Sequence, residues 1–172
     1  VGISKAASRP ELEAAIRLAF RFDDTVLIER AVAGQEIECS ILGNERIEAS
    51  IAGEIVPGKE FYDYDDKYLN GKAQTLIPAR ISAEDQDRVR DLAVRVGHAL
   101  SLEGMARVDF FRESGSGRIY LNEVNTIPGF TSISMYGKMW EASGLPYPDL
   151  LSRLVQLAVE RHERRASLSF AR

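Results

Sequence analysis

The chain has 172 residues, 45% of them hydrophobic and 28% charged, so it can bury a core as one domain or two small lobes. Its formal net charge of −4 argues against a protein that binds nucleic acid through a surplus of basic residues. No apolar run approaches the roughly 18 to 20 residues of a membrane span. The single cysteine, Cys39, cannot form an internal disulfide. Together these totals favour a cytoplasmic protein that binds neither nucleic acid nor membrane.

The first predicted element is an amphipathic helix over residues 9–22. Ser8 occupies the N-cap position, Pro10 lies in the first turn, and Glu11 follows the cap by three residues. The apolar residues after them recur at helical spacing, which is typical of a helix that packs one face.

Three strands are expected next. Residues 24–32 and 36–43 alternate apolar and polar side chains on either side of Ala33 and Gly34, which is typical of two strands joined by a turn. Residues 46–55 follow as a third strand.

A long loop over residues 56–75 separates these strands from a second helix. The loop has turn residues at both ends and no clear period, and loops of this length are usually functional or disordered.

Residues 82–102 then predict a helix capped by Ser82, and two more helices are expected over residues 134–144 and 147–165. The packing stripe expected on the last helix consists of Leu150, Leu151, Leu154, Leu157 and Ala158. Antiparallel strands beside capped helices place the chain in the α+β class.

Residues 104–125 predict a β-hairpin with polar side chains in both strands. Side chains alternate between the two faces of a strand, so Arg107 and Asp109 share one face of the first strand. By the same alternation Glu123 and Asn125 share one face of the second strand. These two pairs are the candidate site.

The turn of the hairpin decides whether the two pairs meet. If residues 115–117 form a three-residue loop, Asp109 lies opposite Glu123 and the four polar side chains share one face. A two-residue loop, or a compensating bulge, would place Asp109 opposite Asn122 and split the set.

Two carboxylates opposite each other in a sheet repel unless positive charge lies between them. Hard cations such as Mg²⁺ take oxygen ligands and usually bind through one or two carboxylates and the phosphates of a substrate. An arginine beside them would neutralise a phosphoryl group in transfer. The residues alone leave two interpretations open, a metal site and a salt-bridged solvated face. The segment after the hairpin, with Gly129 and several hydroxyls ahead of a predicted helix, favours an anion-binding site.

Four segments in order resemble the C-terminal domain of the D-alanine:D-alanine ligases, ATP-grasp enzymes of bacterial cell-wall synthesis. They are "VLIERAVAGQEIECSILG", "FYDYDDKYL", "ARVDFF" and "YLNEVNTIPGFTSISMYGKMW". The resemblance covers nearly the whole chain and implies a mainly antiparallel sheet flanked by helices, with a long lid loop. It further implies that residues 1–172 form this catalytic domain, starting within the end of the central domain, and that the N-terminal domain is missing.

The resemblance assigns roles to the hairpin. Asp109, Glu123 and Asn125 match the ligands of two Mg²⁺ or Mn²⁺ ions that hold the phosphates of ATP. Arg107 matches the arginine that contacts the transferring phosphoryl group, and Gly129 matches the glycine whose N–H helps to form the oxyanion hole.

The resemblance also implies residues for the acceptor and the nucleotide. Ser134 matches the position that holds the acceptor carboxylate, and the lid residues Lys67 and Tyr68 match groups that reach the phosphate and orient the acceptor site. Glu36 matches the acid that binds the ribose hydroxyls. The segment matching the adenine-binding hinge consists of Glu29, Arg30, Ala31 and Val32.

The implied function is ATP-dependent ligation of two D-alanines through an acylphosphate, for peptidoglycan synthesis. Tyr68 favours an amino-acid acceptor, and the complete enzyme is expected to be a homodimer. This chain, which begins at Val1 without an initiator methionine, is expected to be inactive alone. The alternatives are another ATP-grasp carboxylate–amine ligase and a nucleotide-binding module without catalysis.

Overall fold

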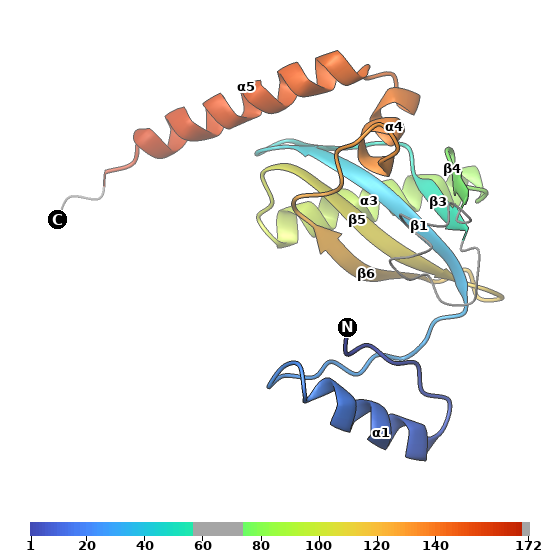
Figure 1. Cartoon of the computed structure of the whole chain (residues 1–172). Coiled ribbons are helices and arrows are strands. Elements are labelled where there is room, and N and C mark those ends of the chain that lie inside the picture. Colours follow the sequence, from blue (N-terminus) through green and yellow to red (C-terminus); the bar gives the residue numbers. More distant parts are fainter. Residues whose placement is uncertain (57–73, 170–172) are drawn as a thin grey trace. The chain divides into compact units, whose positions relative to one another are not determined.

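A computed structural model describes residues 1–56 and 74–169 of the chain (Figure 1). Residues 57–73 of the predicted lid loop, including Lys67 and Tyr68, lie outside the described residues. The predicted ends of the loop are wrong, because Val56 ends one strand and Gln74 and Thr75 begin another. The chain divides into two compact units, Val1–Ala31 and Val32–Arg172.

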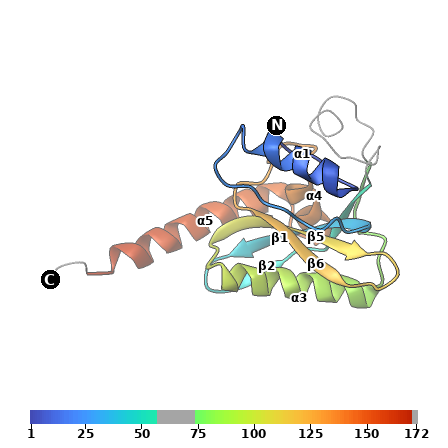
Figure 2. The same ribbon diagram turned by 90° about the horizontal axis from the view of Figure 1, so that it is seen from below.

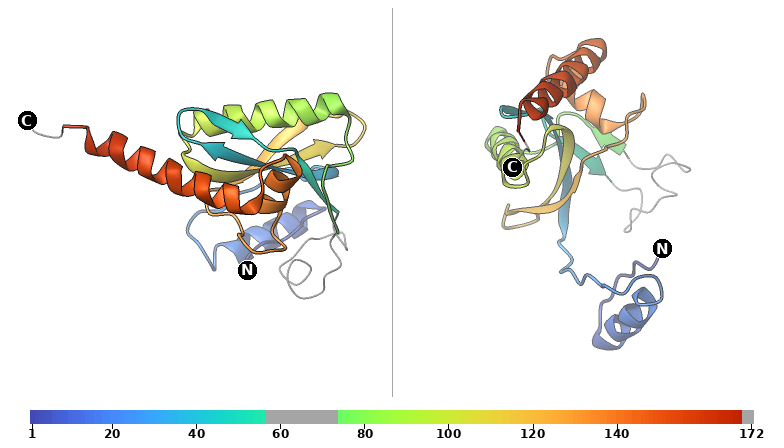
Figure 3. Two further views of the ribbon diagram at one scale, coloured as in Figure 1. Left: turned by 90° about the horizontal axis from the view of Figure 1, so that it is seen from above. Right: turned by 90° about the vertical axis from the view of Figure 1, so that its left-hand side faces the viewer.

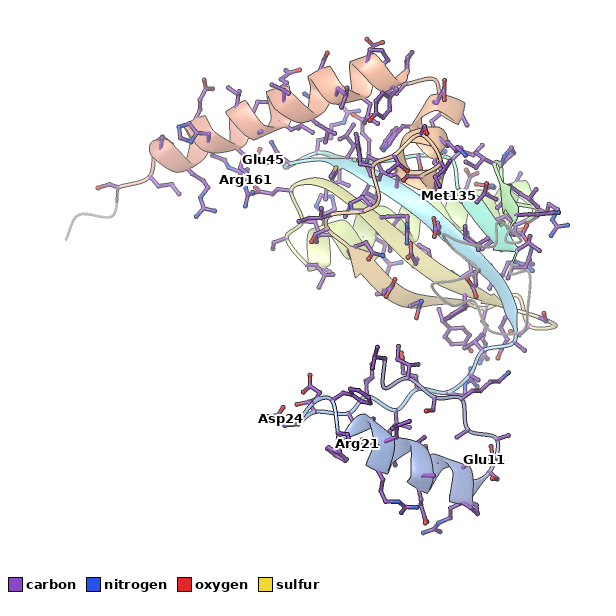
Figure 4. The ribbon with its side chains drawn as sticks, viewed as in Figure 1. Glu11, Arg21, Asp24, Glu45, Met135 and Arg161 are labelled. Atoms are coloured by element: carbon purple, nitrogen blue, oxygen red, sulfur yellow. The ribbon has the colours of Figure 1, made fainter. Side chains whose placement is uncertain are left out.

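The first unit contains α1 (Arg9–Ala19), which ends three residues earlier than predicted. Ser8 stands at the N-cap, and its Oγ donates to Glu11 Oε1 at 2.9 Å. Figure 4 labels Glu11 at the start of this helix. The predicted strand at residues 24–32 is wrong: among the described residues no strand pairs with it, and Leu27 and Ile28 are 78% and 59% exposed. An alternating sequence forms a strand only where a neighbouring strand is available to pair with its backbone N–H and C=O groups.

The second unit is built on one antiparallel sheet, which confirms the α+β class. Its described strands are ordered β4-β3-β1-β5-β6, with β2 also paired to β1. The strands are β1 (Gly34–Gly43), β2 (Ile47–Ala49), β3 (Gly53–Val56), β4 (Gln74–Leu76), β5 (Gly104–Glu113) and β6 (Ile119–Asn125). The helices of this unit are α3 (Ala83–Ala99), α4 (Met135–Ala142) and α5 (Tyr147–Ala166).

The strand predicted over residues 46–55 is broken into β2 and β3. Both pair with β1, but their registers differ by one residue, so the chain bulges between them. Ser50 stabilises the bulge, since its Oγ accepts the backbone N–H of Ser40 at 3.0 Å.

One face of the sheet packs against α3, as the views in Figure 2 and Figure 3 show. As predicted, Ser82 caps this helix, and its Oγ accepts the N–H of Asp85 at 3.1 Å. The strands direct apolar side chains towards the helix because every second residue of a strand shares a face. The core on this face includes Ile37, Cys39, Ile41, Val89, Ala93, Val108 and Phe110.

A second apolar cluster joins β1 to α4 and α5. It contains Leu42, Tyr136, Trp140, Leu150 and Leu157. The predicted stripe of α5 is confirmed for Leu150 and Leu157, which are buried, and for Leu154, which is half-buried against the same cluster. Leu151 and Ala158 are exposed, because each lies one residue further round the helix.

The second half of α5 is held by ion pairs. Arg161 and Arg164 both pair with Glu103, and Arg164 also lies 3.5 Å from Glu45 in the β1–β2 turn. Glu45 and Arg161 are labelled in Figure 4. In the described part of the chain, no helix is long and apolar enough to cross a membrane.

Candidate functional site

The β5–β6 hairpin brings the four predicted polar residues together. Arg107 pairs with Asn125 and Asp109 pairs with Glu123, so all four side chains lie on one face. This is the face opposite α3, because the intervening Val108 belongs to the core beneath that helix. The predicted grouping is confirmed.

The route to this register differs from the prediction. The turn has four residues, 114–117, because Glu113 N donates to Arg118 O at 2.8 Å. Continued from there, the ladder would place Asp109 opposite Asn122. A bulge at Asn122, between the pairs of Asp109 and its neighbour, restores the site register. The three-residue loop was therefore wrong, and the bulge assembles the site instead of splitting it.

Arg107 is held by carboxylates from two strands. Its Nε and Nη2 donate to the two oxygens of Asp109, each at 2.7 Å, and its Nε also lies 3.2 Å from Glu38 Oε2. All three residues are buried. Burial opposes the charge of Arg107, but the hydrogen bonds to Asp109 and the nearby negative charges outweigh it and raise the pKa of the guanidinium.

Glu38 was missed by the sequence interpretation. It lies in the middle of β1, directly opposite Asp109, and is 7% exposed. A carboxylate between Ile37 and Cys39 in a central strand is the signal that could have identified it, since acids are rarely buried without a partner.

Asn125 links the two opposed carboxylates. Its Nδ2 donates to Asp109 Oδ2 at 3.0 Å and to Glu123 Oε1 at 3.1 Å. Rotation of the amide by 180° would present its oxygen to the same space. These three side chains can therefore offer two carboxylates and one amide oxygen to one point.

The donor set fits a divalent cation that also binds phosphate. Among the described residues of this face, three carboxylates, those of Glu38, Asp109 and Glu123, lie around the guanidinium of Arg107, so their charges sum to a negative excess. Mg²⁺ often binds through one or two carboxylates and completes its shell with water and phosphate. Within residues 1–56 and 74–169, the structure shows no group of three or more His, Cys, Asp or Glu side chains arranged to hold a metal ion.

The segment between β6 and α4 forms a small closed loop. Ser134 Oγ accepts the N–H of Thr131 at 2.9 Å, and Ser134 N donates to Thr131 O at 3.0 Å. A Cβ on Gly129 would lie 3.1 Å from Ser134 Oγ, which explains the need for a small residue there. Ser134 is the N-cap of α4 but makes no side-chain cap bond, so the helix N-terminus retains donors for an anion.

Phe130 anchors this loop to the two helices that follow. Its ring centroid lies 5.7 Å from that of Tyr136 and 5.5 Å from that of Tyr147. The sequence interpretation did not identify this anchor, because its partners are distributed over α4 and α5.

The residues predicted for the nucleotide are distributed over both units. Glu36 lies on β1, on the same face as Glu38, and is half-buried. Glu29, Arg30 and Ala31 belong to the first unit and Val32 opens the second, so the adenine-binding role of these four stays a prediction.

A different charged cluster lies on the α3 face of the sheet. Arg112 donates to Asp85 Oδ2 at 2.7 Å and to Gln35 Oε1 at 3.3 Å, and Gln35 donates to Glu54 at 3.2 Å. Arg80 then holds Glu54 with two side-chain hydrogen bonds of 3.1 Å.

The carboxylates of this α3-face cluster are fully paired. The hydrogen bond from Arg112 lowers the pKa of Asp85, which Arg88 also contacts at 2.9 Å. Burial raises the pKa of Glu54, but hydrogen bonds from Arg80 and Gln35 outweigh it and lower the pKa overall.

Comparison with known proteins gives a consistent result. The family model described as "D-ala D-ala ligase C-terminus" matches residues 1–156. The chain is 54% identical over 172 residues to a D-alanine–D-alanine ligase of Solibacter usitatus, covering all of this chain and 53% of the relative. A D-alanine–D-alanine ligase of Thermoanaerobacter sp. is 56% identical over 163 residues, which are 94% of this chain and 45% of the relative. The chain thus spans about half the length of these curated relatives.

Solved structures share the fold. The D-alanine-D-alanine ligase from Coxiella burnetii superposes with a TM-score of 0.83 at 39% identity, over 95% of this chain and 42% of that one. The VanG D-Ala:D-Ser ligase from Enterococcus faecalis gives a TM-score of 0.81 at 41% identity, over 91% of this chain and 45% of that one.

Proposed function

Because the chain belongs to the D-alanine–D-alanine ligase family, we propose that it is the C-terminal catalytic domain, over residues 1–172, of an enzyme that joins two D-alanines with ATP. The observation that carries this proposal is the face of the β5–β6 hairpin, where the bulge places Asp109 opposite Glu123 and Arg107 opposite Asn125. Excess negative charge and one buried guanidinium on that face suit a metal-bound triphosphate.

In this proposal Asp109, Glu123 and Asn125 hold two Mg²⁺ or Mn²⁺ ions. Bound there, the ions would neutralise charge on the phosphates of ATP. Arg107 contributes a fixed positive charge beside the transferring phosphoryl group, and its position in the sheet means that little reorganisation is needed during the reaction. Glu36, on the same face of β1, is proposed to bind the ribose hydroxyls, and the segment from Glu29 to Val32 the adenine.

The reaction has two steps. The γ-phosphoryl group of ATP passes to a carboxylate oxygen of the first D-alanine, which releases ADP and gives an acylphosphate. The neutral amine of the second D-alanine attacks the acyl carbon and the new C–N bond forms. Phosphate leaves with the acyl C–O bond broken, and the nitrogen gives up one proton to the released phosphate. Positioning of the two substrates supplies much of the rate enhancement in such a transfer.

The loop before α4 is proposed to bind the acceptor. Gly129 would direct its N–H at the developing oxyanion, and Ser134 with the N–H groups at the start of α4 would hold the acceptor carboxylate. Lys67 and Tyr68, outside the described residues, are proposed to contact phosphate and acceptor from the lid. The similarity to a D-Ala:D-Ser ligase makes D-serine the second candidate acceptor.

The use of ATP and D-alanine suits a cytoplasmic enzyme of peptidoglycan synthesis, and we propose this location together with a homodimeric full-length protein. These proposals depend on the family and not on a contact in the described residues.

The test is ATP-dependent phosphate release by the full-length protein that contains this sequence. With D-alanine, the wild type should release phosphate and form the dipeptide, and Asp109→Ala should lower kcat by roughly a thousandfold or more. Glu48→Gln, at an exposed carboxylate of β2, is the matched control and should be near normal. Near-normal turnover by Asp109→Ala would reject the site, and nucleotide binding without phosphate release would favour a non-catalytic module.

A further inference from the structure

Arg107 has two carboxylate partners on neighbouring strands. Asp109 accepts from both Nε and Nη2 at 2.7 Å, and Glu38 Oε2 lies 3.2 Å from Nε. Glu38 and Asp109 face each other in the β1–β5 ladder, and both are at most 8% exposed. Bulk water is therefore a poor substitute for either partner.

The proposed metal role of Asp109 conflicts with its contact to Arg107. Both of its oxygens receive Arg107 N–H groups, and Oδ2 also accepts from Asn125. A cation coordinated by Asp109 weakens this short bidentate contact, because the cation repels the guanidinium and competes for the lone pairs of Oδ2, which already accepts two N–H groups. A buried guanidinium that lost its anion would carry an uncompensated charge, which is strongly unfavourable.

We propose that Glu38 is a positioning residue that retains Arg107 when Asp109 turns from the arginine to the divalent cation. The inference rests on the proposed function, since it requires Asp109 to be a metal ligand. Glu38 acts through Arg107: it keeps the guanidinium at its place in the sheet and leaves the other N–H groups to face the phosphoryl group.

The neighbours of Glu38 on β1 cannot replace it. Ser40 lies opposite Arg107, but its Oγ donates to Tyr136 O at 3.3 Å and carries no charge. Across the described ranges, the ion pairs of Arg107 are with Asp109 and Glu38. Glu38 is thus the carboxylate already in place to take over the arginine.

A simpler role for Glu38 would be to attract the cation by charge alone. Glu38→Asp separates the two roles, because it keeps the negative charge and withdraws the carboxylate by one methylene from Arg107. Glu38→Gln removes the charge as well. Glu54→Asp is the matched control, since Glu54 is also a buried, arginine-bound carboxylate of the same sheet but lies on the α3 face.

The first measurement is binding of Mn²⁺, without nucleotide, to the full-length protein that contains this sequence, followed by electron paramagnetic resonance of the free ion. Glu38→Asp and Glu38→Gln should each weaken binding about tenfold, because neither side chain holds a carboxylate against Arg107 once Asp109 turns to the cation. Glu54→Asp should stay within about twofold of the wild type. Wild-type affinity in Glu38→Asp would overturn the positioning role.

The second measurement uses the wild-type chain and does not depend on how well a variant folds. The ¹⁵N spectrum of the arginine side chains contains the Nε–H of Arg107, identified by its loss in Arg107→Lys. With Mg²⁺ added, this proton should remain slowly exchanging, because Glu38, 3.2 Å away, takes it over from Asp109. Rapid exchange with Mg²⁺ present would contradict the proposal.

Asp109→Asn distinguishes failure of this inference from failure of the proposed function. If Asp109→Asn weakens Mn²⁺ binding and Glu38→Asp does not, the inference about Glu38 is wrong and the metal site stands. If the wild type and Asp109→Asn bind Mn²⁺ equally, Asp109 is not a ligand, and the proposed function loses its site together with the inference.

Discussion

The two faces of the sheet each bury carboxylates against arginines, and the comparison shows how such a cluster serves chemistry or structure. Among the described residues, three carboxylates of the hairpin face meet one guanidinium. On the α3 face the two carboxylates Asp85 and Glu54 meet three guanidiniums, those of Arg80, Arg88 and Arg112. Four of these carboxylates, Glu38, Asp109, Glu54 and Asp85, are buried, whereas Glu123 is exposed and the arginines of the α3 face are more exposed than Arg107. The charge balance differs: a deficit of positive charge leaves room for cations, whereas complete pairing leaves none.

Insertion of one alanine between Asn122 and Glu123 should disturb the hairpin face most strongly. With the single bulged residue kept at Asn122, the new alanine lies opposite Asp109, and Glu123 and Asn125 turn to the α3 face. Turnover of the full-length protein should fall by a thousandfold or more, and Mn²⁺ binding should be lost. Insertion of one alanine after Ser116 in the turn is the control and should retain most activity. Retained Mn²⁺ binding after the insertion at Asn122 would contradict the role given to the register.

Glu38→Asp is expected to have the next largest effect. A misplaced Arg107 should lower kcat about 10- to 100-fold, whereas KM for ATP should change less than about threefold. Glu36 lies two residues before Glu38 on the same face of β1. Glu36→Asp should have the opposite kinetic effect to Glu38→Asp, with a raised KM for ATP and little change in kcat. Steady-state kinetics at varied ATP measure both constants. A raised KM with normal kcat for Glu38→Asp would assign Glu38 to nucleotide binding instead.

Arg112→Ala tests the α3 face, where the expected effect is on stability. The variant leaves the carboxylate of Asp85, whose side chain is 9% exposed, without its main partner. The free energy of unfolding should fall by about 2 to 3 kcal/mol in urea titrations, less than for a fully buried pair because Arg112 is itself 27% exposed. Arg88→Ala, at a half-exposed arginine, should cost under about 1 kcal/mol. An equal fall in the free energy of unfolding for Arg112→Ala and Arg88→Ala would contradict the view that Arg112 is the main partner of Asp85.

The pH dependence of stability should be the smallest effect and should also belong to the α3 face. The pKa of Asp85 is lowered in the folded state, so its contribution is complete above the unfolded value of about 3.9 and is lost as pH falls through the folded pKa. The stability difference between the wild type and Asp85→Asn should therefore shrink on acidification. A difference that stays constant from neutral pH down to the strongly acid range would reject the contribution of this carboxylate.

The sequence predicted the hairpin site better than it predicted the strands around it. Alternation places Arg107 with Asp109 and Glu123 with Asn125 whatever the fold, because strand periodicity is local. The register could not be settled, since turn length and the bulge at Asn122 compensate each other. Residues 24–32 have the same alternation, but among the described residues no strand pairs with them. The alternation of a sequence does not show whether a neighbouring strand is present, so this strand was predicted wrongly.

The contacts of Glu38 and of the α3-face cluster could be predicted only if the order of the strands in the sheet were known. Nothing local to residues 36–43 shows that β1 lies beside β5, and only that pairing places Glu38 against Arg107. Likewise, Asp85 and Arg112 lie 27 residues apart and meet through the packing of α3 on the sheet. Contacts of this kind depend on tertiary structure, which a period in the sequence does not encode.

Location of the metal in crystals of the full-length protein with Mn²⁺ and ATP tests the central claim most directly. The account predicts anomalous scattering peaks at roughly 2 Å from oxygens of Asp109 and Glu123, with Arg107 retained by Glu38. Peaks at the α3-face carboxylates Asp85 or Glu54, or a nucleotide bound without metal at the hairpin, would contradict it.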